Sequence, residues 1–457
     1  MFQLQKAFSL QEESKTLILT NDLENALVTT IFEGLNLSND ILSNEPFTTV
    51  YTLGKLAAKK VIIIEKDFLE NTKKTTTVLK AISGLKEDAI LLLDSFDEKK
   101  ISHLFEGLLT IGYTFNKLKS KDDNKQYNLA YFTEKTLDDA IHEGVVYGEA
   151  INHTKDLVNL PYNYLNATGL AEYATSLSVI DNLTVKILNK KEIEALNMGA
   201  FLGVNKGSKD EPKLIHIDYN GDASSKEITA LIGKGVMYDT GGYSLKTPQG
   251  MPNMKCDMAG AATVLGSIEA IARLKYKANV SVIIAATDNR IGDDAIVPDD
   301  ILTAANGLTI EIISTDAEGR LTLADALWYA QKEGATKLID VATLTGAIVA
   351  ALGKDYTGAF TNNKNFLEEL KKVSEETKEG IWEMPISEGY REELKSYAAD
   401  MSNKGGRLAG ASIAAAFLEK FIENDCPWIH LDIAGTSFES ATGATGTMVK
   451  TLARLFK

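Results

Sequence analysis

The C-terminal two-thirds of the chain alternates short apolar runs with stretches of helical character, and this alternation constrains the fold more than any other feature. The apolar runs predict strands at residues 280–286, 308–313 and 337–342, and the other pattern predicts helices at 257–274 and 321–332. Such alternation implies a largely parallel sheet that is covered by helices on both faces. Ligands in that architecture collect beyond the carboxyl ends of the strands, so we expect the functional residues there.

The first 150 residues have the same kind of pattern but no catalytic constellation. Residues 60–64 and 89–93 predict buried strands between charged helical stretches. A long helix, which Pro161 terminates, carries the expected boundary between two domains. The predicted fold class is therefore α/β with two domains. A smaller, non-catalytic N-terminal α/β domain spans residues 1–150, and a larger catalytic domain with a mainly parallel central sheet flanked by helices spans 151–457.

Composition excludes several classes of protein. The chain has 457 residues, of which 44% are hydrophobic and 24% charged, as in ordinary soluble globular proteins. Its net charge of −15 argues against broad nucleic-acid binding. It contains no secretory signal pattern and no apolar run long enough to span a membrane. With only Cys256 and Cys426, in no CxxC arrangement, we expect a cytoplasmic protein without a membrane partner.

In the first polar segment, residues 232–246, an apolar strand runs into a glycine-rich turn. This turn carries Lys234, Asp239 and Lys246. Asp257 follows eleven residues after Lys246. Taken alone, the Gly-Lys-Gly sequence is a poor nucleotide-binding signal, because it completes neither of the two common phosphate-binding glycine motifs.

A second polar segment follows the strand predicted at 308–313. It reads Ser-Thr-Asp-Ala-Glu-Gly-Arg at 314–320. If the chain stays extended there, Asp316, Glu318 and Arg320 project to the same side, because side chains in a strand alternate between two faces. The alternative is structural, since acidic residues before a helix also stabilise its N-terminus.

Together these segments would place four carboxylates in one cleft. Mutual repulsion would raise their pKa values unless cations compensate. Two divalent ions would supply four positive charges, and carboxylate oxygens are good ligands for them. The pattern thus favours a two-metal hydrolytic site, with ions about 3.5–4 Å apart that share a water or hydroxide. A histidine-based zinc protease and a serine hydrolase are disfavoured, because the sequence has neither HExxH nor GxSxG; His430 reads as a core residue.

These segments resemble the leucyl aminopeptidase family, the cytosol aminopeptidases that use two metal ions. The family signature Asn-Thr-Asp-Ala-Glu-Gly-Arg matches residues 314–320, with Ser314 in place of asparagine. The resemblance covers about residues 155–457. Further matches are Gly-Lys-Gly at 233–235, Asp-Thr-Gly-Gly at 239–242, Met-Lys-Cys-Asp-Met at 254–258, Ala-Thr-Leu-Thr-Gly-Ala at 342–347 and His-Leu-Asp-Ile-Ala-Gly at 430–435.

The resemblance implies a set of metal ligands on matching positions. They are Lys234, Asp239, Asp257, Asp316 and Glu318. Asp239 and Glu318 would contact both ions. Lys234 would bind as a neutral amine, so arginine could not replace it. Zinc or manganese is the expected ion, and magnesium or cobalt would also suit these ligands.

The resemblance also implies roles in catalysis and substrate binding. A metal-bridged hydroxide would attack the scissile carbonyl, Lys246 would stabilise the oxyanion, and Arg320 would hold a bicarbonate ion that shuttles protons. The substrate would contact a set of residues around the metals. These are Lys246, Met254, Thr343, Leu344 and Gly346.

The function implied is an aminopeptidase that acts on peptides with leucine-like N-terminal residues. A narrow dipeptidase, such as a cysteinylglycine hydrolase, would use the same site. A DNA-binding regulatory role is the alternative outside enzymes, and the negative charge disfavours it. The family resemblance further implies a homohexamer. Ser314, Thr240 and Cys256 depart from the residues usual in the family, and none of these departures removes a ligand.

Overall fold

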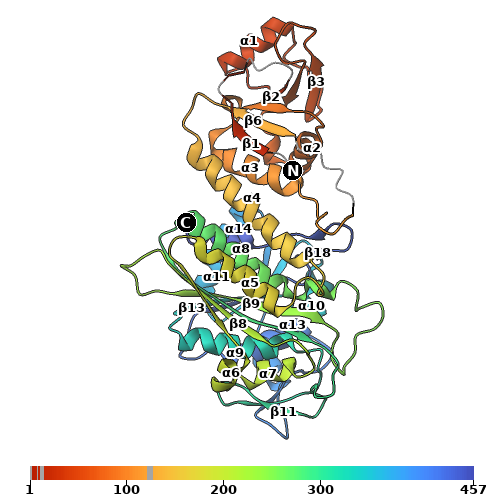
Figure 1. Cartoon of the computed structure of the whole chain (residues 1–457), viewed down its shortest axis with the longest axis vertical. Helices are drawn as coiled ribbons and strands as arrows, with labels where there is room; N and C mark the ends of the chain where they lie inside the picture. Colours follow the sequence, from red (N-terminus) through yellow and green to blue (C-terminus); the bar gives the residue numbers. More distant parts are fainter. Residues whose placement is uncertain (1–2, 8, 11–14, 121–126) are drawn as a thin grey trace. The chain divides into compact units, whose positions relative to one another are not determined.

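The computed structural model describes residues 3–7, 9–10, 15–120 and 127–457. Its contacts divide the chain into two compact units, Met1–Asn152 and His153–Lys457 (Figure 1). The long helix α4, Asp138–Asn159, contains the point of division.

Six strands in the described part of the first unit form a sheet in the order β1-β6-β5-β2-β4-β3. All neighbours are parallel except β3 and β4, which pair antiparallel. The strands are β1 Gln3–Lys6, β2 Thr16–Thr20, β3 Phe47–Tyr51, β4 Lys60–Ile64, β5 Ala89–Leu92 and β6 Asn128–Phe132, and the helices are α1 Ala26–Leu35, α2 Thr72–Ser83, α3 Ile101–Ile111 and the first part of α4.

Both faces of this sheet are buried, which explains its continuous apolar runs. In β4, Ile62 and Ile64 pack with α2 and α3, whereas Val61 and Ile63 pack with α1. A strand covered by helices on both sides has no reason to alternate apolar and polar residues. The strand predicted at 60–64 is therefore found as predicted, and the one at 89–93 ends one residue early.

Residues 153–457 form an eight-stranded sheet in the order β15-β14-β17-β13-β9-β10-β8-β7. Its four central strands, from β17 to β10, are parallel, and antiparallel pairs occur only toward the edges. The strands are β7 Leu183–Leu188, β8 Lys213–Asn220, β9 Thr229–Asp239, β10 Asn279–Asn289, β13 Lys337–Ala342, β14 Thr357–Thr361, β15 Ile381–Glu383 and β17 Trp428–Asp432. This arrangement confirms the predicted α/β class with a mainly parallel central sheet.

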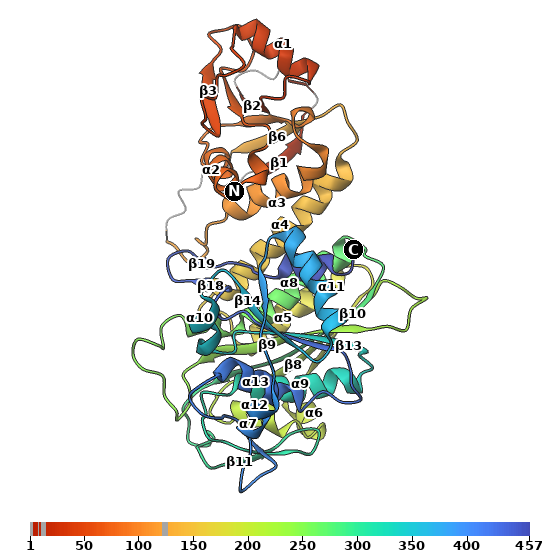
Figure 2. The ribbon, with the colours of Figure 1, turned by 180° about the vertical axis from the view of Figure 1, so that it is seen from behind.

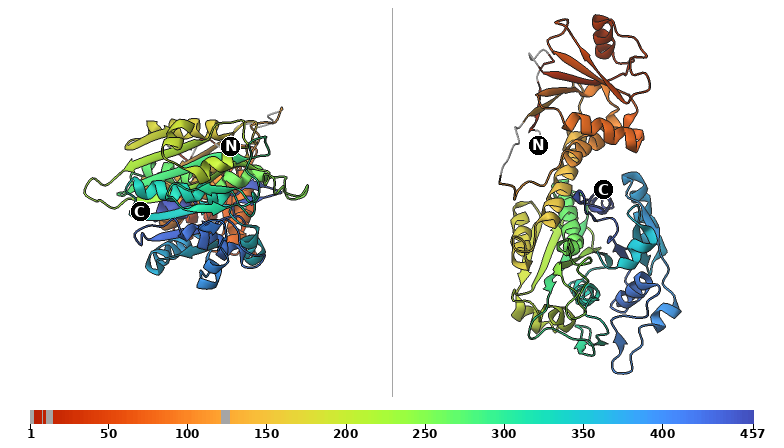
Figure 3. Two further views of the ribbon diagram at one scale, coloured as in Figure 1. Left: turned by 90° about the horizontal axis from the view of Figure 1, so that it is seen from below. Right: turned by 90° about the vertical axis from the view of Figure 1, so that its right-hand side faces the viewer.

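Helices cover both faces of this sheet (Figures 1 and 2). One face carries α5 Ala167–Ser176, α8 Ala259–Arg273, α11 Lys364–Thr377 and α14 Val449–Arg454; the other carries α6 Lys190–Ala195, α7 Gly199–Asn205, α9 Gly319–Lys332 and α13 Gly410–Glu419. Two further views show the sheet between these layers (Figure 3). The short helices α10 Gly346–Leu352 and α12 Glu388–Glu392 complete the unit.

Three local expectations in this unit differ from the structure. The strand predicted at 308–313 is only β12, Thr309–Glu311, and it belongs to a small side sheet with β11 Ile301–Thr303 and β16 Met401–Ser402. The segment at 233–239 is not a turn, because β9 continues to Asp239 between two parallel neighbours. The 314–320 segment is not extended, since α9 already begins at Gly319.

The Gly-Lys-Gly sequence serves helix packing instead. A Cβ atom on Gly233 would lie 2.6 Å from Cα of Ala261, so only glycine lets α8 approach β9 this closely. That approach brings the start of α8, and the short 3-10 turn Met254–Met258 before it, against the middle of the strand. The position of Asp257 follows from this contact.

No helix of the described residues has both the length and the hydropathy that a membrane crossing requires.

Candidate active site

Three carboxylates meet beyond the carboxyl end of β9. One oxygen from each of Asp239, Asp316 and Glu318 lies within 4.8 Å of the others. Asp239 and Glu318 are buried, whereas the Asp316 side chain keeps 37% of its exposure. Asp239 ends its strand, and the other two residues precede α9. The predicted convergence of the two acidic segments is therefore present in the structure.

Close approach of two loops creates this cluster. Gly241 has a φ of 84°, and a Cβ atom there would lie 2.9 Å from Oδ1 of Asp316. Thr315 joins the loops, because its hydroxyl donates to the Gly241 carbonyl at 2.6 Å and accepts the Ser244 N–H at 2.7 Å. Glycine at this position is thus a steric requirement of the site.

The fourth acidic residue, Asp257, joins the cluster through a lysine. The buried ammonium of Lys234 lies 2.7 Å from Oδ1 of Asp257 and 3.0 Å from Oε1 of Glu318. It also donates to the Thr343 carbonyl at 3.1 Å. Burial acts to lower the pKa of Lys234, but the charges of Asp257 and Glu318 outweigh it and raise the pKa above its usual range. The surroundings of Lys234 therefore stabilise a positive charge.

A second lysine, Lys246, contacts two other carboxylates of the cluster. Nζ of Lys246 lies 2.7 Å from Oδ2 of Asp239 and 2.6 Å from Oδ1 of Asp316. Burial, followed by repulsion from Glu318, raises the pKa of Asp239 to about 6. Two ammonium groups therefore hold together carboxylates that would otherwise repel one another.

Two carboxylate oxygens in this cluster remain buried and unsatisfied. Oδ2 of Asp257 and Oε2 of Glu318 have no hydrogen-bond partner among the residues that the structure describes. Such orphaned acceptors are costly. Carboxylate oxygens together with one amine are a suitable donor set for divalent cations. The residues present therefore fit a metal centre.

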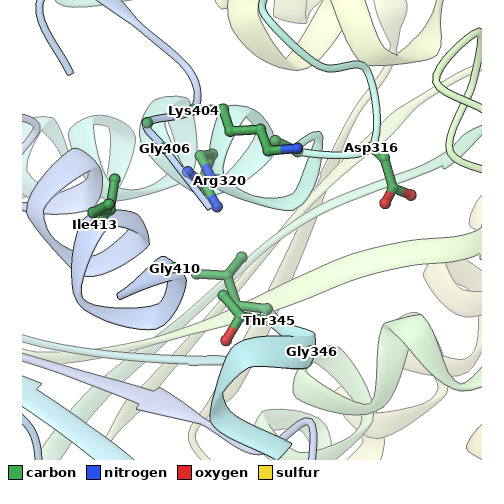
Figure 4. A pocket seen from close by; sticks show the side chains of 11 residues that line it. Asp316, Arg320, Thr345, Gly346, Lys404, Gly406, Gly410 and Ile413 are labelled. Atoms are coloured by element: carbon green, nitrogen blue, oxygen red, sulfur yellow. The ribbon is translucent and has the colours of Figure 1, made fainter. Parts of the chain in front are cut away.

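A pocket with a volume of about 190 Å³ adjoins the cluster (Figure 4). Asp316 lies at one end, and Arg320 and Lys404 extend from its wall. Arg320 is buried and donates from Nη1 to the Asn403 carbonyl at 2.7 Å, while its Nε has no partner within the described residues. Burial lowers the pKa of Arg320 to about 10, which leaves it cationic at neutral pH. It reaches the pocket from the first turn of α9, not from an extended segment.

Besides Lys246, three of the predicted substrate residues lie around this centre. The Thr343 hydroxyl donates to Oδ1 of Asp257 at 2.7 Å, and Leu344 and Gly346 line the pocket. Met254 starts the 3-10 turn that carries Asp257 and lies outside that pocket.

The profile of the cytosol aminopeptidase family, catalytic domain, matches residues 152–453 of this sequence. The match covers most of the chain and includes every residue of the cluster. The chain belongs to the cytosol aminopeptidase family. It is accordingly a peptidase of the aminopeptidase class, and the family is metal-dependent, in keeping with the carboxylate cluster.

Sequence reasoning missed one buried residue that connects the two loops of this aminopeptidase. Asn289, at the end of β10, donates from Nδ2 to Oδ1 of Asp239 at 2.8 Å and to the Thr315 carbonyl at 2.9 Å. Its own carbonyl accepts the N–H and the hydroxyl of Thr240, each at 2.9 Å. The strand was predicted to end at 286, three residues too early; carrying it on would have placed Asn289 beside Asp239.

Asn403 holds the loop that precedes α9. This fully buried side chain accepts the Ile313 N–H at 2.8 Å and donates to the Ser314 carbonyl at 2.7 Å. Ser314, which replaces the usual asparagine of the family, accepts the Asp316 N–H at 3.3 Å through its hydroxyl. With serine at position 314 the loop therefore still has a supporting hydrogen bond.

Two further residues with reactive side chains are Cys256 and His430. Burial raises the pKa of the Cys256 thiol to about 12, so it is neutral at physiological pH and a poor nucleophile. His430 is fully buried, and its Nδ1 lies 2.5 Å from Oδ1 of Asp340. Its interpretation as a core histidine agrees with this position.

Replacing Asn289 by leucine should weaken metal binding by about 10–100-fold, since residues that orient metal ligands typically contribute this much. The variant loses the bond that aims Asp239 and the bond that anchors Thr315. Calorimetric titration of each ion into metal-free protein measures the effect. Asn279→Leu is the matched control, because Asn279 anchors a loop at the other end of the same strand. Equal ion affinity in both variants would contradict the role of Asn289.

Proposed function

We propose that this protein is a two-metal aminopeptidase that releases leucine-like N-terminal residues from peptides. Five residues would hold two divalent ions, with zinc or manganese as the first candidates. They are Lys234, Asp239, Asp257, Asp316 and Glu318. The observation that carries the proposal is the meeting of three carboxylates within 4.8 Å, beside two orphaned carboxylate oxygens, in a chain of this family.

When bound, such ions would polarise the scissile carbonyl and lower the pKa of a nucleophilic water. Lys234 must give up its proton to act as a ligand, which an amine can do and a guanidinium cannot. Lys246 stays cationic. Once ions neutralise Asp239 and Asp316, its ammonium is free to stabilise the oxyanion that develops on the substrate.

Arg320 is proposed to hold bicarbonate. Its guanidinium is fixed by the Asn403 carbonyl and borders the pocket, and its planar fork matches two oxygens of a carbonate group. Bound bicarbonate would supply a proton carrier, a group that the carboxylates and lysines of the cluster do not offer. Nε of Arg320, without a partner in the described chain, supports an anion there.

Preference for leucine-like residues rests on Met254, Thr343 and Gly346. Apolar lining discriminates by about 1–3 kcal/mol per methylene, so we propose a graded preference and not strict selection. A narrower dipeptidase remains the second candidate, because it would use the same residues. The family resemblance also underlies our proposals of a homohexamer and a cytoplasmic location, and a net charge of −15 makes nucleic acid an improbable partner.

Metal removal tests the proposed function most directly. Protein dialysed against chelator should lose hydrolysis of leucyl p-nitroanilide, and zinc or manganese should restore it. Each ion should also raise the unfolding temperature, because a ligand that binds only the folded state stabilises it. Full activity after complete metal removal, verified by elemental analysis, would reject the two-metal proposal. A panel of N-terminal residues then measures the side-chain preference.

A further inference from the structure

The pocket beside the acidic cluster has one wall of positive charge. Its ionisable side chains are Asp316, Arg320 and Lys404. Asp316 belongs to the cluster, and Lys246 already lies 2.6 Å from its carboxylate. Arg320 is the residue proposed to hold bicarbonate, which leaves Lys404 as the second cation on the pocket side (Figure 4). An anionic group that enters the pocket would therefore be attracted toward that wall.

The backbone around Lys404 is fixed, although its side chain is exposed. Asn403 is held to the loop before Asp316 by its side chain, as described above. The Gly406 N–H donates to Oε2 of Glu393 at 3.0 Å, and a Cβ atom on Gly405 would lie 2.9 Å from Cβ of Glu393. Lys404 thus begins from a rigid position at the rim of the pocket.

The Lys404 ammonium has no acidic partner among the residues of the described chain. It extends toward Asp316 across the pocket (Figure 4). An unpaired lysine normally points into solvent, where its charge is hydrated. One that lines a pocket beside a hydrolytic centre is available for a substrate group.

The position of the pocket indicates which part of a peptide would occupy it. Of the five proposed metal ligands, the pocket borders only Asp316. Of the residues proposed to contact the N-terminal side chain, Met254 and Thr343 are associated with Asp257 and lie outside the pocket, and Gly346 lies on its border. A peptide that crosses the cluster from Asp257 to Asp316 would place its leaving residue in the pocket.

Resting on the proposed function, we propose that Lys404 binds the free α-carboxylate of a dipeptide, and that the enzyme therefore prefers dipeptides with a free C-terminus to their neutral amides. The ammonium would form a charge-assisted hydrogen bond with the carboxylate of the leaving amino acid. Lys404 is then a specificity-determining residue, whereas the cluster performs the cleavage.

The test compares Leu-Gly with its neutral amide, Leu-Gly-NH2, using the metal-loaded full chain. For the wild type, kcat/KM should be about threefold to fivefold higher for Leu-Gly, mainly through KM, as expected for one ion pair with an exposed lysine. The ratio should fall to about one in Lys404→Met, recover in Lys404→Arg and decline with added salt. Lys364→Met removes the same charge from an exposed site on α11, outside the pocket, and should keep the wild-type ratio.

Two outcomes would overturn the assignment. One is an unchanged ratio in folded Lys404→Met, with folding confirmed by thermal unfolding. The other is a Lys404-dependent preference for Leu-Asp-NH2 over Leu-Asn-NH2 without any preference for Leu-Gly, which would assign Lys404 to an acidic side chain. Hydrolysis of leucyl p-nitroanilide by the wild type keeps the two proposals separate, because its absence rejects the aminopeptidase function itself.

Discussion

Lys246→Met should lower kcat by about 100–1000-fold while the protein still binds both ions, because loss of one oxyanion-stabilising donor typically has this effect. In the structure Lys246 neutralises Asp239 and Asp316. Bound ions would neutralise these two carboxylates instead. The Lys246 ammonium would then no longer be needed to hold the cluster together. Metal affinity should therefore be unchanged or higher, since the competing cation is gone. Steady-state kinetics with leucyl p-nitroanilide and elemental analysis of the dialysed protein measure the two quantities.

The conservative variant sharpens this experiment. Lys246→Arg keeps the positive charge and should retain more activity than Lys246→Met. If ion content falls in parallel with kcat in the methionine variant, Lys246 holds the site together and is not the oxyanion donor.

Glu318→Gln should reduce bound ions below two per chain and lower kcat/KM by about a thousandfold. Glu318 is buried between the other two carboxylates of the cluster and the Lys234 ammonium. A bound ion contributes several kcal/mol of transition-state stabilisation, and each ~1.36 kcal/mol is a factor of ten in rate. Glutamine keeps the shape of the side chain but offers a neutral, weaker ligand. Elemental analysis, calorimetry and kinetics with leucyl p-nitroanilide give the three readouts.

Glu333→Gln is the matched control for this variant. Glu333 follows the last turn of α9, whereas Glu318 precedes the first, so both changes remove one charge next to the same helix. The control should keep two ions and normal activity. Normal ion content and activity in Glu318→Gln as well would show that the carboxylate cluster is not the metal centre.

Local patterns were sufficient for the fold class and for several strands. The strands at 60–64 and 337–342 have the predicted bounds, because a long apolar run that is buried on both faces has few alternatives to a central strand. Local patterns failed where tertiary contacts override propensity. Gly-Lys-Gly at 233–235 looks like a turn, yet pairing with β10 and β13 and the close approach of α8 keep it in the strand.

The same contrast between local pattern and tertiary contact applies to the acidic cluster. The motif at 314–320 identifies Asp316 and Glu318 as functional candidates, but an extended segment would have oriented them differently from the helix start that is observed. The residues that hold the loops, Asn289 and Asn403, lie 26 and 89 positions from Thr315 and Ser314, respectively. No short-range spacing rule connects residues so far apart.

By itself, the sequence determined the α/β architecture, the family and the identity of the acidic and basic side chains that converge. Apolar periodicity and a seven-residue motif are local properties, so they can be recognised without coordinates. Only the tertiary structure decided that Lys234 joins Asp257 to the other three carboxylates, that two asparagines fix the loops and that Lys404 faces the pocket. Those contacts depend on which strand ends are neighbours in the sheet. Long-range packing decides this, and no local pattern encodes it.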